Sequence, residues 1–188
     1  MTLPKSKHLY LYFFLLLSLL FFIINIYQSQ YFHWTAALDQ DIMIIYNSLL
    51  ISSGFEQEYR DHPAYTTFVI YAFLIKIFSL INPDILSNIN NLTNSINPDR
   101  DLQILFYFCR NVNVIINISL VFLLYKLLLK IKLTQITAIL SCCILIVSGW
   151  YTESFFYLRN ENLAIIFFLI STIFQIKFFE DRKFVFII

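Results

Sequence analysis

Residues 9–27, LYLYFFLLLSLLFFIINIY, form the apolar run that decides the fold class. A helix of about 19 residues is long enough to cross the ~30 Å hydrocarbon layer of a lipid bilayer. The polar residues 27–31 (YQSQY) follow the run, without the small residues of a signal-peptide cleavage site. Lys5, Lys7 and His8 precede it, and basic residues favour the cytoplasmic side. We therefore expect an uncleaved first membrane helix that starts in the cytoplasm.

The composition of the whole chain also indicates a membrane protein. Of its 188 residues 59% are hydrophobic and 13% are charged, and the mean hydropathy is +0.71. A soluble domain of this length needs a larger polar surface. A formal net charge of +1 gives no electrostatic basis for binding nucleic acid. With only two glycines and four prolines for tight turns, we expect an all-α, polytopic transmembrane helical bundle.

Further apolar segments follow the first one. They run over residues 64–81, 102–125, 133–151 and 162–179, and residues 184–188 resemble the first turn of another. The Asn-rich stretch 82–101, which contains Pro83 and Pro98, is expected to be a loop. We expect residues 1–188 to form a single membrane domain, the N-terminal part of a longer bundle.

The first external loop, residues 28–63, is predicted to hold a short interfacial helix. Its apolar positions Ile42, Ile45, Tyr46 and Leu49 have helical spacing. Asp39 precedes the pattern as a candidate N-cap, and residues 52–54 (SSG) follow it as a stop signal. At about 13 residues the helix is too short to span a bilayer, so it is expected to lie at the membrane surface.

Two topologies are consistent with the positions of the basic residues. If every apolar segment crosses, the clusters 126–132 and 177–183 lie outside, against the positive-inside tendency. If residues 64–125 contain an odd number of crossings, because one segment is re-entrant or lies flat, both clusters lie inside. The second arrangement agrees better with the charge pattern.

The candidate site lies in the same external loop. Asp39, Asp41 and Tyr46 belong to the predicted short helix, and residues 60–63 (RDHP) stand at the start of the next apolar segment. A carboxylate can accept a proton from a hydroxyl group, and a cation can stabilise a departing phosphate. Between two hydrophobic segments, such residues suit a substrate with a polar head and an apolar tail.

These residues resemble a motif of the GT-C superfamily of membrane glycosyltransferases. An external acidic residue with Tyr46, followed by Asp61-His62-Pro63 behind a first membrane helix, is similar to the protein O-mannosyltransferase and aminoarabinose-transferase-like bacterial enzymes. The resemblance covers residues 5–82. The second proline and the leucine of the family's Asp-His-Pro-Pro-Leu-like stretch are replaced by Ala64 and Tyr65, and no glutamate follows Asp41.

The resemblance implies transfer of a sugar from a polyprenyl-phosphate donor to a lipid, glycan or protein acceptor. The site would face the external, periplasmic side of a bacterial inner membrane. Asp41 would be the catalytic base, and His62 with Arg60 or Arg110 would hold the donor phosphate. Asp39, Tyr46 and Asp61 would contact the substrates.

Each candidate also has a structural interpretation. Asp39 can act only as a helix cap, and Asp41 only as a favourable charge at a helix start. The two carboxylates can also hold a divalent cation together. Arg110 lies inside an apolar run and shares a helical face with Asn113 and Asn117, so it faces a cavity or partner, or else snorkels to the boundary. Residues 153–161 form either a second polar cluster or a solvated loop.

Two other functions stay open at this level. The chain can be a non-enzymatic membrane component, such as part of a flippase or transporter, or an assembly partner, with Arg110 and Asn113 lining a path. It can also be an inactive fragment of a glycosyltransferase. The external acidic residues and the Asp61-His62-Pro63 motif favour the enzyme, because a transporter does not need them there.

Overall fold

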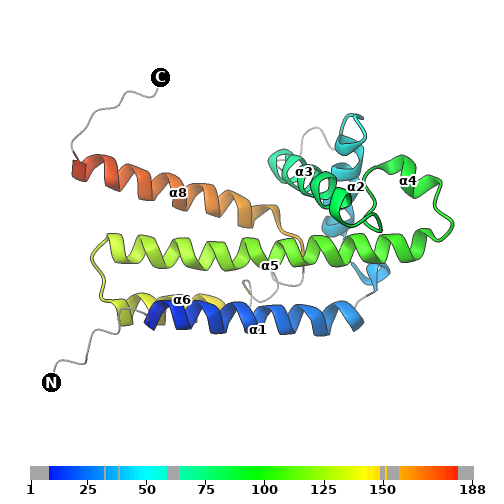
Figure 1. The fold of residues 1–188 in the computed structure, drawn as a ribbon. Helices are drawn as coiled ribbons and strands as arrows, with labels where there is room; N and C mark the ends of the chain where they lie inside the picture. The colour runs from blue at the N-terminus through cyan, green and yellow to red at the C-terminus, as the bar shows by residue number, and fades with distance from the viewer. Residues whose placement is uncertain are drawn as a thin grey trace.

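The computed structural model describes residues 9–31, 33–37, 39–58, 64–148, 151 and 157–181. Within these ranges the chain forms seven α-helices and one short 3-10 helix, with no strand, as the composition predicts (Figure 1). In chain order these are α1 (Leu9–Tyr31), η1 (Trp34–Ala36), α2 (Asp39–Ser52), α3 (Tyr65–Ile81), α4 (Ile89–Thr93), α5 (Pro98–Lys130), α6 (Gln135–Ile146) and α8 (Asn160–Asp181).

Helix α5 contacts α1, α4, α6 and α8, whereas α2 and α3 pack mainly on each other. Helix α5 has 33 residues, which correspond to a length of about 50 Å. The helix starts at Pro98, four residues before the apolar run, because the Asn97 side chain accepts a hydrogen bond from the Arg100 amide and proline suits the first helical position. The expected loop 82–101 therefore ends earlier than predicted, and it also contains the five-residue helix α4.

The other helices form two groups along α5 (Figure 1). Helices α1, α6 and α8 lie along the part of α5 that leads to Lys130, whereas α2, α3 and α4 gather at the Pro98 end. Each group has its own apolar core. The core at the Pro98 end includes Phe68 and Leu105, and the core of the long bundle includes Val121 and Leu169.

One end of the long bundle carries lysines from two helices. The C-terminal ends of α5 and α8 lie at the same end as the N-terminal end of α1 (Figure 1). Lys126, Lys130 and Lys177 are therefore at this end, where Lys130 pairs with Glu180. Among the helices described between residues 64 and 125, only α5 runs along the bundle, whereas α3 stays at the Pro98 end. One long helix of the bundle therefore comes from this part of the chain, and the number of membrane crossings stays a prediction.

Two described helices are long and apolar enough to cross a membrane. They are α5, with a mean hydropathy of 2.2 in its most apolar window, and α8, with 1.9. By length and composition they indicate association with a membrane. The predicted crossings at 9–27, 64–81 and 133–151 are not confirmed, since only Leu15–Ile24 of α1 counts as a shorter apolar helix, α3 has 17 residues and α6 has 12. Twelve residues of helix rise only about 18 Å.

Buried amide groups fix α8 against α5. The Asn162 side chain donates to the Asn117 side chain at 3.2 Å, and the Asn117 amide donates to the Asn113 carbonyl at 2.9 Å. The Tyr151 hydroxyl donates to the Asn117 carbonyl at 2.7 Å. Polar groups this deeply buried are costly unless they are hydrogen-bonded, so these bonds restrict how α8 can slide along α5.

Asn117→Ala is expected to destabilise the protein by about 1 kcal/mol, because it removes the acceptor of the buried Asn162 amide. The measurement is thermal unfolding of the purified protein in detergent, followed by circular dichroism. Ser119→Ala is the matched control: among the described residues the Ser119 hydroxyl donates to the Ile115 carbonyl of its own helix, so the unfolding temperature of this variant should not change. Equal unfolding temperatures for both variants would contradict the role given to Asn117.

Candidate functional site

Asp39 and Asp41, which are two positions apart in the sequence, point to different sides of helix α2. Residues two positions apart on a helix point about 200° apart. Asp39 is exposed, whereas Asp41 is fully buried. Asp39 is the first residue of α2, in its first turn and not at the predicted cap position before it. The candidate site therefore has an outer side and an inner side.

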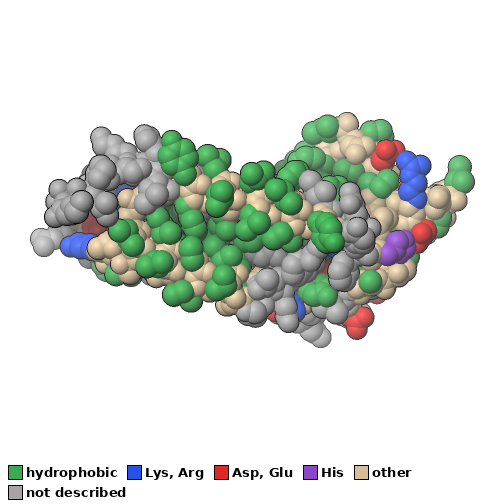
Figure 2. Space-filling model, turned by 90° about the horizontal axis from the view of Figure 1, so that it is seen from below, with side chains coloured by type: hydrophobic (Ala, Val, Ile, Leu, Met, Phe, Trp, Pro, Cys, Tyr) green, Lys and Arg blue, Asp and Glu red, His purple; other side chains and the backbone are tan. Residues whose placement is uncertain are grey.

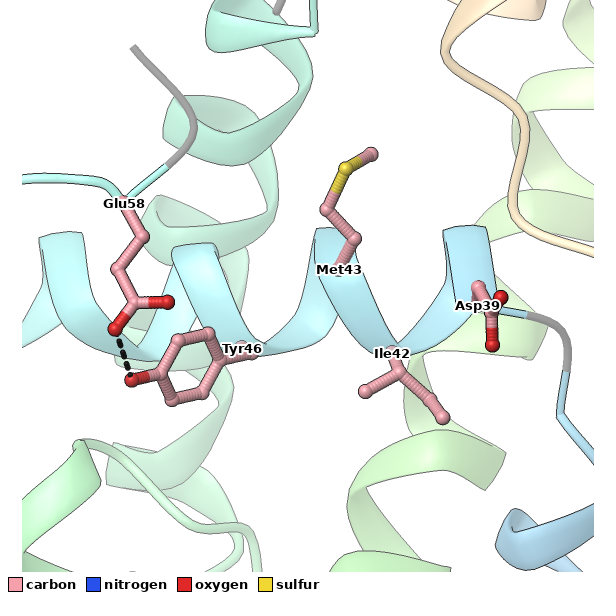
Figure 3. Close-up of a pocket in the computed structure, with 5 residues that line it drawn as sticks. All are labelled: Asp39, Ile42, Met43, Tyr46 and Glu58. Carbon is pink, nitrogen blue, oxygen red and sulfur yellow. Dashed lines mark hydrogen bonds between the residues drawn. The ribbon is translucent and has the colours of Figure 1, made fainter.

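The outer side is a cavity of about 280 Å³ on the surface of α2 (Figure 3). Its lining residues are Asp39, Ile42, Met43, Tyr46 and Glu58. The Tyr46 hydroxyl donates to Glu58 Oε1 at 2.9 Å, and the Glu58 amide donates to the Asn47 side chain at 2.9 Å. The cavity brings together Asp39 and Tyr46, both predicted to contact substrate. It also adds Glu58, which sequence reasoning did not place in the site.

The inner side is built around Asp41. Its Oδ1 atom accepts a hydrogen bond of 2.5 Å from the backbone amide of Leu158, a residue 117 positions further along the chain. Its Oδ2 atom is buried and has no hydrogen-bond partner among the described residues. Nearly all buried polar atoms in proteins have a partner, and an exception often marks a functional site.

Residues 157–160 hold the first turn of α2 in this position. The Arg159 guanidinium donates to Gln40 Oε1 at 3.0 Å, and the Gln40 side-chain amide donates to Asn160 Oδ1 at 2.8 Å. On the α5 side, the Asn113 amide donates to the Tyr157 carbonyl at 3.1 Å. The segment 157–160 is therefore bonded to both α2 and α5. The interpretation of Arg159 as part of a solvated loop is wrong, since its side chain is half-buried and bonded to α2.

The surroundings of Asp41 change its acidity. Burial raises the pKa of its carboxyl from 3.8 to about 6, because the ionised form loses its hydration. The Leu158 amide and the positive charges of Arg110 and Arg159 act in the opposite direction and only partly compensate. A carboxyl with a pKa near neutrality can both accept and release a proton at physiological pH.

Arg110 belongs to the inner side. It lies on α5 with 5% of its surface exposed, and its guanidinium carbon is 5.8 Å from the centre of the Phe106 ring. Asn113 and Asn117 are buried on the same helix, so the predicted polar face of α5 is confirmed. Snorkelling of Arg110 to the boundary is ruled out by its burial. Arg110 and Asp41 are close enough for their charges to interact, although 69 residues separate them.

Some predicted residues lie outside the part of the chain that the structure describes. These are Arg60, Asp61 and His62, together with Pro63 and Glu153. Their expected contacts with donor and substrate stay predictions. Glu161 is described and exposed at the start of α8.

A shared metal site on the two aspartates does not fit this geometry. Asp39 lines the outer cavity, whereas Asp41 is bonded to Leu158 on the inner side. Among the described residues, no group of three or more His, Cys, Asp or Glu side chains could hold a metal ion. The pair Asp39 and Asp41 therefore does not form the two-carboxylate ligand set considered from the sequence.

Comparison with protein-family models, with curated proteins and with solved structures finds no match for this chain. The resemblance to the GT-C superfamily therefore rests on the sequence motif and on its position behind a first apolar helix.

Asp41→Asn is expected to change how stability depends on pH. Below pH 3.8 the carboxyl is protonated in both the folded and the unfolded protein, and above about pH 6 it is ionised in both. Since ionisation costs more in the folded protein, Asp41 lowers the free energy of unfolding progressively between these values. The full effect is about 3 kcal/mol, at about 1.4 kcal/mol for each pKa unit. The Asp41→Asn variant should not show this decrease in the free energy of unfolding as the pH rises.

Urea unfolding in detergent between pH 3.5 and pH 7.5 would measure the difference. Asp39→Asn is the matched control, because Asp39 lies on the same helix but is exposed, and this variant should keep the wild-type fall. Parallel curves for Asp41→Asn and wild type would show that Asp41 does not carry the burial cost.

Proposed function

We propose that this chain is part of a membrane glycosyltransferase that transfers a sugar from a polyprenyl-phosphate donor to an acceptor at the external membrane face. One observation carries the proposal. Asp41 is a fully buried carboxylate with one oxygen bonded to an amide, one oxygen without a partner among the described residues, and an arginine within electrostatic range. Such an arrangement is typical of functional carboxylates rather than of helix caps.

In the proposed reaction Asp41 is the general base. Its Oδ2 atom takes the proton of an acceptor hydroxyl, and the acceptor oxygen forms a bond to the anomeric carbon of the sugar. The bond between that carbon and the phosphate oxygen breaks, and the polyprenyl phosphate leaves with the electron pair. Arg110 stabilises the negative charge that grows on this phosphate.

Access to Asp41 requires a local movement. Asp41 and Leu158 are almost completely inaccessible to solvent. The acceptor reaches Oδ2 when the segment 157–160 separates from the first turn of α2, which breaks the contacts with Asp41 and Gln40. A general base is often fully aligned only in the substrate complex.

The outer cavity gives a second set of polar groups for the substrates. Asp39 and Glu58 can accept hydrogen bonds from sugar hydroxyls, and Ile42 and Met43 add apolar side chains to the lining (Figure 3). We retain Arg60, Asp61 and His62 as further substrate contacts on the basis of the motif.

The surface supports a multi-pass placement in the membrane with the site outside. Figure 2 shows apolar side chains over the middle of one face, with charged side chains and a histidine gathered toward the Pro98 end of α5. The basic residues at the opposite end, among them Lys126 and Lys130, favour the cytoplasmic side. If the Lys130 end of the bundle faces the cytoplasm, α2 lies at the external face together with the outer and inner sides of the candidate site.

The position of the buried polar groups favours an enzyme over a transporter. Asp41 and Arg110 lie toward α2, whereas the core of the long bundle, which on α5 begins at Val114, is mostly apolar and includes Leu120 and Val121. A translocation path needs polar groups through the whole layer. Within the described residues the charged members of this cluster lie at one side and the buried amides of α5 reach no further than Asn117, which suits a site at a membrane face better than a path through the layer.

Asp41→Asn is expected to lower the transfer rate at least about 100-fold, because the amide cannot accept the acceptor proton. The measurement is transfer of radiolabelled sugar from its polyprenyl-phosphate carrier in membranes that contain the protein at equal amounts. Asp84→Asn removes an exposed carboxylate away from both sides of α2 and should leave the rate unchanged. Unchanged transfer by Asp41→Asn would overturn the proposed mechanism.

Arg110→Gln is expected to raise the KM for the polyprenyl-phosphate donor, because the guanidinium that faces the phosphate is lost. Arg110→Lys keeps the charge but not the planar group, so it should restore part of the donor affinity. Lys126→Gln, at the other end of α5, is the control for loss of a single positive charge. If all three variants bind the donor like wild type in a titration, Arg110 does not contact the phosphate.

A further inference from the structure

Helix α3 has an apolar side that no described element covers. Its inner side, with Phe68, Tyr71 and Ile75, is buried in the core beside α2. The opposite side carries Val69, Phe73 and Ile77, which are 37%, 63% and 37% exposed. These three residues are four positions apart and therefore form one stripe along the helix.

A ring contact with α5 shows where along the axis of α5 helix α3 lies. The Phe78 ring of α3 lies 5.1 Å from the Phe108 ring of α5, measured between ring centres. From Phe108, the exposed apolar residues Ile115 and Phe122 follow at seven-residue spacing on the same side of α5. This stripe ends at Lys126, whose ammonium nitrogen lies 5.2 Å from the centre of the Phe122 ring.

The length of that stripe corresponds to a hydrocarbon layer. The helical rise from Phe108 to Lys126 is about 27 Å, at about 1.5 Å per residue. A bilayer has a hydrocarbon core of ~30 Å. If Lys126 marks one boundary of the layer, Phe108 marks the other, and α3 lies at this second boundary.

We infer that α3 is an interfacial helix whose Val69, Phe73 and Ile77 stripe inserts into the membrane leaflet at the Pro98 end of α5. Phe78 follows Ile77 in the chain, is itself 40% exposed, and joins the exposed apolar surface of α3 to that of α5 at the Phe108 ring, so the lipid that surrounds α5 also reaches α3. In Figure 1, α3 lies with α2 and α4 at the Pro98 end and does not follow the long bundle.

The residues beside the stripe suit the boundary between lipid and water. Tyr65 is exposed at the first residue of α3, and Lys76 is exposed near its end. Tyrosine is enriched at this level of the bilayer, and a lysine can reach the phosphates of lipid headgroups. A partner protein would not require this pairing of an aromatic and a basic anchor.

The inference is independent of the proposed enzymatic activity, since it requires only that α5 crosses a bilayer. The inference gives α3 a structural role, because the inner side of α3 packs on α2. An α3 held at the lipid boundary keeps α2, and with it Asp41, at the level of the lipid headgroups.

Spin labels at single cysteines would test this placement. The protein, with Cys109, Cys142 and Cys143 replaced, is reconstituted in vesicles of phosphatidylcholine and phosphatidylglycerol and labelled in the variant Phe73→Cys. Accessibility to oxygen and to a water-soluble nickel complex gives the depth of the label. We expect a lipid-exposed label within about 10 Å of the headgroup phosphates.

Two matched labels calibrate the depth scale. Ile115→Cys on α5 should lie about 10 Å deeper than Phe108, the level of α3, and Asp84→Cys should contact water. A label at position 73 that is accessible to nickel in the same way as at 84, or that is shielded from both reagents by a protein partner or second copy, would overturn the inference. So would a label at the bilayer centre. Ile77→Cys carries the same expectation if the Phe73 variant does not fold.

Discussion

The hydrogen bond from the Leu158 amide to the Asp41 carboxylate is the contact on which the arrangement of the site depends. It joins the first turn of α2 to the segment that leads into α8, across 117 residues of sequence. The bonds of Gln40 with Arg159 and Asn160 reinforce the same junction. Because α2 otherwise packs mainly on α3 and α8 packs on α5, this junction ties the short helices to the long bundle.

The sequence predicts the helical class and much of the polar pattern. The apolar runs locate α1, α5 and α8, and the spacing of Arg110, Asn113 and Asn117 correctly predicts one buried face of α5. The early start of α5 also has a signal in the sequence, since an asparagine followed by proline is a common way to begin a helix. The sequence does not show whether residues 64–81 form a membrane-crossing helix or a surface helix. The segment is almost uniformly apolar, so it has no periodicity that would distinguish the two.

The inner side of the site could be predicted only in part. The residue types of Asp41 and Arg110 indicate both as site residues. The partner of Asp41, however, is the backbone amide of Leu158, and a backbone N–H group is present at every residue except proline, so the sequence does not indicate which one binds. The opposite directions of Asp39 and Asp41 follow from helical geometry once the start of α2 is known. The contact of Glu58 with Tyr46 depends on the path of the chain after α2, which local patterns do not specify.

Helix α5 carries both cores of the protein on one uninterrupted rod of 33 residues. In a bilayer that is thinner or thicker than its apolar part, such a helix adjusts by tilting. The Pro98 end, which carries α2 and α3, then changes its angle to the bilayer while α3 stays at the lipid boundary. Lipid thickness would in this way change the angle between the long bundle and the short helices around Asp41, without any ligand bound to the protein.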